Sequence, residues 1–162
     1  LGKFAPLIGL GAGFDNERTG RQNIYLNAAI QGISTQRVNQ VLNEIIDFTE
    51  LGEFIDRPVK IYSSGMVGRL GFAIASYLAP DIVFLDEVFS VGDIGFQSKS
   101  MERILEFRER KTTLVFISHG LESIRKLCTR TIWLEHGQIV MDGVTDEVVS
   151  AYQTSRLAHE NP

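Results

Sequence analysis

The chain has 162 residues, of which 44% are hydrophobic and 22% charged, the ordinary composition of a soluble globular domain. A net charge of -4 offers no basic footprint, which argues against nucleic acid as a partner. The single cysteine excludes an internal disulfide and suits a reducing compartment.

No segment reads as a membrane span. The most apolar stretch, Leu70 to Ala79, has half of the roughly 20 residues that a spanning helix needs. No signal-peptide pattern opens the chain, and its first residue is leucine instead of methionine. We therefore expect Leu1 to be an internal position of a longer parent, and any membrane role to come through a partner.

The first elements in chain order are a short strand and a helix. The Gly-rich segment 1–22 is predicted to form a strand over about 4–10 and then a loop. From Asn23 the pattern becomes helical. One face of this predicted helix carries Ile24, Ala28 and Ala29.

Two further helices are predicted before residue 80. Ser34 is typical of an N-cap and should begin a helix that runs to about Phe48. A short segment over 51–55 follows, and Pro58 interrupts the pattern. The next helix should begin after Ser63-Ser64-Gly65 and run to about Leu78.

Beyond residue 80, apolar strands alternate with helices. The predicted elements are a buried strand over 81–86, a helix over 94–109, a second buried strand over 113–118, a helix over 121–128, a hairpin of strands 131–135 and 138–141 around His136-Gly137, a turn at Asp142-Gly143, and a helix over 145–154. This alternation predicts a doubly wound α/β core with a parallel sheet. The mainly helical residues 1–80 should form a separate lobe, with a boundary to the core (81–162) near Pro80.

The strongest chemical signal is the apolar strand that ends in Asp86 and Glu87. Ligands bind at the carboxyl ends of strands in open α/β sheets. An aspartate there can hold Mg²⁺, and the next carboxylate can polarise a water. Two adjacent acids can also be a plain solvated turn.

Two weaker signals accompany it. The segment from Ser63 to Met66 places hydroxyls and a glycine at a helix start, where free N–H groups and the helix dipole attract anions. An ordinary N-cap with a glycine would look the same. His119 follows a predicted strand, where it could face a site or be structural.

Taken together and in this order, these segments resemble the ABC ATPase family. The matching motifs are the signature loop at Tyr62-Ser63-Ser64-Gly65-Met66, the Walker B strand at 82–86 followed by Glu87, the D-loop at Ser90-Val91-Gly92-Asp93, and the switch histidine in Ser118-His119. The resemblance covers nearly the whole chain. It implies a P-loop NTPase-like core with a parallel sheet, a helical subdomain carrying the signature loop, and the cofactors ATP and Mg²⁺.

Within that family, the sequence is similar to the ATPases that export polysaccharides such as O-antigen, capsule and teichoic acid. Gly11-Ala12-Gly13-Phe14, the segment Thr19 to Ile24 and the Tyr-Ser-Ser-Gly-Met signature carry this likeness. Gly11 to Gly13 stand where most relatives have the Q-loop glutamine, which puts the usual glutamine contact to Mg²⁺ and water in doubt.

The resemblance implies a role for each motif residue. Asp86 would organise Mg²⁺, Glu87 would be the catalytic carboxylate, and His119 would hold the γ-phosphate and the attacking water. The implied cofactor-binding residues are Ser63, Ser64, Gly65, Met66 and Asp93. The signature loop would act on nucleotide bound by the other subunit of a head-to-tail homodimer. An integral-membrane permease would be the further partner, at the cytoplasmic face of the plasma membrane.

One required part is absent from the sequence. A phosphate loop reads G-x-x-x-x-G-K-[ST], and Gly2-Lys3-Phe4 has phenylalanine where the Mg²⁺-binding hydroxyl belongs. We expect this loop upstream of Leu1 in the parent, and expect residues 1–162 alone to be inactive. Two alternatives stay open at this point: a soluble ABC ATPase of DNA repair or translation, and a truncated, non-catalytic binding module.

Overall fold

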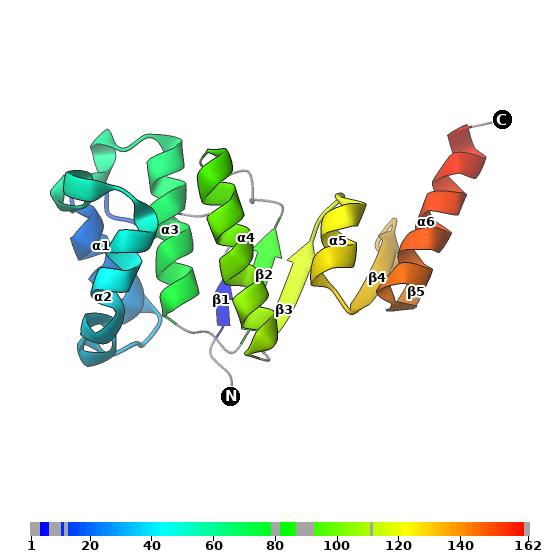
Figure 1. The fold of residues 1–162 in the computed structure, drawn as a ribbon, viewed down its shortest axis with the longest axis horizontal. Coiled ribbons are helices and arrows are strands. Elements are labelled where there is room, and N and C mark those ends of the chain that lie inside the picture. Colours follow the sequence, from blue (N-terminus) through cyan, green and yellow to red (C-terminus); the bar gives the residue numbers. More distant parts are fainter. Residues whose placement is uncertain are drawn as a thin grey trace. The chain divides into compact units, whose positions relative to one another are not determined.

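The computed structural model describes residues 4–6, 11, 13–78, 82–86, 93–110 and 112–160. The elements in chain order are β1 (Phe4–Pro6), α1 (Gly20–Ile30), α2 (Thr35–Thr49), short 3-10 helices at Gly52–Asp56 and Val59–Ile61, α3 (Ser64–Tyr77), β2 (Ile82–Asp86), α4 (Ile94–Glu109), β3 (Thr113–Ile117), α5 (Leu121–Leu127), β4 (Arg130–Glu135), β5 (Gln138–Val144) and α6 (Thr145–Glu160) (Figure 1). Contacts divide the chain into two compact units, Leu1–Val115 and Phe116–Pro162. No helix of the described residues is long and apolar enough to cross a membrane. The predicted boundary near Pro80 stays a prediction, since Pro80 lies outside the described residues.

Helix α1 begins earlier than the sequence pattern predicts. It starts at Gly20 because Thr19 forms a capping box: its hydroxyl accepts from the Gln22 amide, and the Gln22 side chain accepts from the Thr19 amide. Of the three residues predicted on one face, Ile24 and Ala28 are buried and Ala29 is exposed, because the buried face of α1 runs through Asn23, Ile24 and Ala28.

The helices predicted after Ser34 and Ser63 are confirmed. Ser34 caps α2 by accepting a hydrogen bond from the Arg37 amide. The buried residues of α2 recur at helical spacing: Val38, Val41, Ile45 and Phe48. Helix α3 packs against α1, α2 and α4. Its long apolar run is therefore the centre of the first unit.

An aromatic cluster joins α2, α3 and α4. Phe48 of α2 stacks on Phe72 of α3, with ring centroids 5.8 Å apart. Phe96 of α4 makes edge contacts with both rings, at 5.5 and 6.2 Å. Phe96 is 1% exposed. This cluster holds the start of α4 against α3, where the candidate site lies.

A three-stranded sheet has the order β1-β2-β3. Strands β1 and β2 are parallel, with Phe4 opposite Ile82, so a parallel sheet is confirmed. Val83 and Leu85 of β2 are buried, as predicted. The expectation of a second buried strand was wrong in the described structure. Val115 and Ile117 are 38% and 57% exposed, because β3 lies at the end of the strand order and β2 lies in its middle.

The second unit is built on an antiparallel hairpin of β4 and β5. The predicted turn is confirmed: His136 and Gly137 both have positive φ, as a two-residue hairpin turn requires. The predicted turn at Asp142-Gly143 was wrong, because β5 continues to Val144. The Asp142 carboxylate accepts hydrogen bonds from Arg130 on β4 at 2.6 and 2.8 Å, so the two residues form an ion pair between β4 and β5.

Candidate functional site

The start of helix α3 carries the predicted signature residues. Ser63 is the N-cap, and its hydroxyl accepts from the Met66 amide at 3.2 Å. Ser63 and Ser64 are exposed, whereas Gly65 and Met66 are half-buried. The N-terminus of α3, where the helix dipole is positive, therefore faces solvent next to the hydroxyls of Ser63 and Ser64. This is an arrangement suited to an anion.

The start of helix α4 carries Asp93. One carboxylate oxygen of Asp93 caps the helix by accepting from the Phe96 amide at 3.0 Å, and the other accepts from Arg69 at 2.5 Å. The Phe96 hydrogen bond is the main reason that the pKa of Asp93 is lowered, and Arg69 lowers it further. Asp93 is therefore a carboxylate at neutral pH. It is already engaged at both oxygens.

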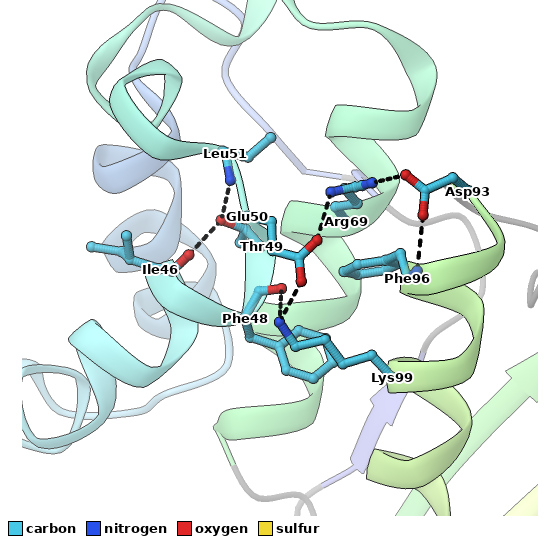
Figure 2. Close-up of polar contacts among 9 residues, drawn as sticks. All are labelled: Ile46, Phe48, Thr49, Glu50, Leu51, Arg69, Asp93, Phe96 and Lys99. Atoms are coloured by element: carbon cyan, nitrogen blue, oxygen red, sulfur yellow. Dashed lines mark hydrogen bonds and ion pairs between the residues drawn. The ribbon is translucent and has the colours of Figure 1, made fainter.

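Arg69 lies between two carboxylates from different segments (Figure 2). One guanidinium nitrogen bonds Asp93, and the other bonds Glu50 at 3.2 Å. Glu50, the C-cap of α2, also accepts from Lys99 of α4 at 2.8 Å. The Arg69 guanidinium lies 4.9 Å from the centre of the Phe96 ring, a cation–π distance. This network ties the end of α2, the body of α3 and the start of α4 to one another.

These two helix starts line one pocket of about 350 Å³. Its walls are Glu50, Leu51, Phe54, Ser63, Gly65, Met66, Arg69 and Asp93. The structure thus brings Ser63, Gly65 and Met66 together with Asp93 at one pocket, while Ser64 is not among the lining residues. The nucleotide-binding role of these residues stays a prediction. Sequence reasoning missed the Glu50–Arg69 pair. The available signal was an arginine in an otherwise apolar helix.

The remaining predicted residues are less informative. Asp86 ends β2, but its side chain lies outside what the structure describes, and Glu87 lies outside the described residues. His119 is exposed; it comes two residues after β3 and belongs to the second unit. Among the described residues there is no group of three or more His, Cys, Asp or Glu that could hold a metal ion. A carboxylate such as that of Asp86 is nevertheless the kind of oxygen ligand that Mg²⁺ takes.

The chain was compared with known proteins. It is 44% identical over 152 residues to the O-antigen export system ATP-binding protein RfbB of Klebsiella pneumoniae, covering 94% of this chain and 62% of the relative. It is 42% identical over 148 residues to the teichoic acids export ATP-binding protein TagH of Bacillus anthracis, covering 91% of this chain and 27% of the relative. The chain is a homologue of export ATP-binding proteins. The resemblance predicted from its motifs is confirmed.

The chain spans less than two thirds of the length of these curated relatives. No protein-family model matches it. The alternative of an ABC ATPase in DNA repair or translation is not favoured, because the matched relatives are export proteins.

Solved structures show the same fold. An ATP-binding subunit of an ABC transporter matches with a TM-score of 0.81 at 20% identity, over 93% of this chain and 62% of that one. A dimeric post-hydrolysis structure of an ATP-binding cassette bound to ADP and Pi matches with a TM-score of 0.70 at 20% identity, over 88% of this chain and 63% of that one. The predicted α/β ABC ATPase fold is therefore confirmed.

Proposed function

We propose that this chain is part of the ATP-hydrolysing subunit of an ABC exporter that carries a polysaccharide or lipid-linked glycan. The observation that carries the proposal is the 44% identity to an O-antigen export ATP-binding protein over 94% of the chain. The subunit would work as a homodimer on the cytoplasmic face of the plasma membrane, together with an integral-membrane permease.

Each motif residue has a task in this proposal. When bound, MgATP supplies the phosphoryl group that is cleaved. Asp86 would hold the metal, Glu87 would orient and deprotonate the attacking water, and His119 would hold that water against the γ-phosphate. The phosphates would be bound by hydrogen bonds and by the positive end of the α3 dipole, with Asp93 close by. The residues that bind them would be Ser63, Ser64, Gly65 and Met66.

The signature residues would act on the nucleotide of the other subunit. Three observations support this: the hydroxyls of Ser63 and Ser64 are exposed, the N-terminus of α3 is open to solvent beside them, and a matched solved cassette is dimeric. Each site would then combine Glu87 of one subunit with Gly65 of its partner. Closing and reopening of the dimer would drive the permease.

The catalytic role of Glu87 is tested in the full-length protein. Glu87→Gln should keep nucleotide binding and lower turnover by about 10²- to 10⁴-fold, the usual contribution of a positioned base. Glu102→Gln, at an exposed position of α4, is the matched control and should hydrolyse ATP normally. Near-normal turnover of Glu87→Gln would remove the assignment.

The arrangement in trans is tested by mixing two inactive variants. Gly65→Asp places a negative charge where the partner's γ-phosphate would lie, so it should abolish turnover but leave nucleotide binding intact. A mixed dimer of Gly65→Asp and Glu87→Gln subunits has one intact site if these residues serve opposite sites. Turnover above that of either variant alone is expected. No gain in demonstrably mixed dimers would place both residues in one subunit's own site.

Residues 1–162 alone are expected to bind no MgATP at micromolar concentrations. Their sequence lacks the G-x-x-x-x-G-K-[ST] cradle for the β- and γ-phosphates. Titration calorimetry on this stretch is the measurement. Stoichiometric micromolar binding would mean that Gly2-Lys3 or the Gly11 to Gly13 loop is a phosphate site.

A further inference from the structure

Arg69 is held by three contacts of its guanidinium, two with carboxylates and one with an aromatic ring. It is 16% exposed, it lies over the Phe96 ring, and each of its two terminal nitrogens bonds a different carboxylate. These carboxylates, Glu50 and Asp93, are 19 and 24 residues away in the sequence. Arg69 therefore joins three segments that are far apart in the sequence.

The backbone at Glu50 points to a purpose for its side chain. Glu50 is the C-cap of α2 in the left-handed region, with φ 55°. Glycine or asparagine is favoured at such a position, because a Cβ is strained there. Glutamate at this position is conformationally strained, yet it provides the carboxylate that accepts hydrogen bonds from both Arg69 and Lys99. Backbone strain of this kind is retained where a side chain is needed.

The position of Arg69 links the two helix starts of the candidate site. It lies on α3, six residues after the cap Ser63, which corresponds to about 9 Å along a helix. Its partner Asp93 caps α4 through the Phe96 amide. Any displacement of the α3 start relative to the α4 start must therefore break or stretch the Arg69–Asp93 bond.

We propose that Arg69 is a positioning residue that fixes the start of α4, with Asp93, against the start of α3, with Ser63, by bridging Glu50 and Asp93. This inference rests on the proposed function, because these two helix starts are the segments assigned to the partner's nucleotide. When the nucleotide is engaged at Ser63, the bridge transmits the movement of α3 to the D-loop residue Asp93. The two segments then move as one body.

The deciding variant is Arg69→Lys in the full-length protein. Lysine keeps the positive charge but offers a single ammonium in place of the planar fork, so it cannot hold both carboxylates in the same way. We expect kcat to fall at least fivefold while KM for ATP changes less than twofold. The matched control is Arg37→Lys, on the exposed face of α2. It should leave both constants unchanged.

A second readout does not depend on ATP hydrolysis. Amide hydrogen exchange should accelerate at least tenfold over residues 94–97 in Arg69→Lys, while exchange in α1 stays as in the wild type. If the wild type hydrolyses no ATP, the proposed function fails, but this exchange measurement still decides whether Arg69 fixes the α4 start. Wild-type kcat together with wild-type exchange in Arg69→Lys would overturn the inference.

Glu50→Gly keeps the test decisive if Arg69→Lys folds poorly. Glycine relieves the positive φ at this position, so the fold is retained, while the carboxylate that anchors Arg69 is lost. A fall in kcat of at least threefold, with an unchanged melting temperature and faster exchange over 94–97, is the expected result. A variant as active and as protected as the wild type would contradict the role of the bridge.

Discussion

Replacing Gly20 with alanine is expected to disturb the segment that leads into Ser63. A Cβ at Gly20 would lie 2.5 Å from the Tyr62 hydroxyl oxygen and 3.1 Å from the Ile55 carbonyl oxygen. Tyr62 immediately precedes Ser63, and its hydroxyl donates a 2.5 Å hydrogen bond to the Phe54 carbonyl. The added methyl group therefore forces the tyrosine away from α1 and from its acceptor.

The expected magnitude follows from three contributions. Alanine is a better helix former than glycine, which stabilises the variant by at most about 1 kcal/mol. Overpacking a filled site costs about 1–3 kcal/mol. The lost Tyr62 hydrogen bond costs about 1 kcal/mol more. We expect Gly20→Ala to lower the free energy of unfolding by about 1–3 kcal/mol, which is a fall in Tm of about 3–10 °C at this size.

The assay is urea unfolding of Gly20→Ala, Tyr62→Phe and the double variant in the full-length protein. Tyr62→Phe removes the atom nearest to the new methyl group, so the double variant should lose less stability than the sum of the single variants. Gly143→Ala is the control, because its Cβ would meet Val148 at an ordinary 3.7 Å. If Gly20→Ala were as stable as the wild type, the close packing around Tyr62 would have no energetic consequence, and the reasoning would be refuted.

Three further variants test contacts within the two units: a buried amide, an aromatic ring and an ion pair. Asn23→Ala should lose about 2–4 kcal/mol in urea unfolding, because the fully buried amide bonds the backbone of Asp15 in both directions; a loss under about 0.5 kcal/mol would contradict this. Phe96→Ala should lose about 3–5 kcal/mol in thermal unfolding, because its ring fills the aromatic cluster, and a smaller loss than about 1 kcal/mol would refute that role. The hydrogen bond from Arg130 lowers the pKa of Asp142 in the folded protein. The ionised Asp142 therefore stabilises the fold above about pH 4, and this contribution is lost as the pH falls further. Asp142→Asn should therefore weaken the acid dependence of unfolding, and an unchanged acid profile would speak against the pair.

Elements with local causes were predictable from the sequence. Ser34 and Ser63 cap the helices that follow them, because a cap needs only its own hydroxyl and an amide three residues later. His136-Gly137 forms the hairpin turn because both residues can adopt positive φ next to each other. The family resemblance was readable for the same reason, since each of its motifs is a short continuous segment.

Features that depend on distant partners could not be predicted in this way. The sequence predicted a turn at Asp142, but in the structure Asp142 lies in β5 and pairs with Arg130 of β4. The pattern also did not show that Asn23 would be buried in α1.

The sequence by itself therefore determined the element types, the order of the motifs and the resemblance to export ATP-binding proteins. Only the tertiary structure decided how Glu50, Arg69 and Asp93 meet, because they come from the end of α2, the body of α3 and the start of α4. Side-chain pairing across helices is set by the packing of Phe48, Phe72 and Phe96, which holds those helices together. No local pattern in the sequence records the result of that packing.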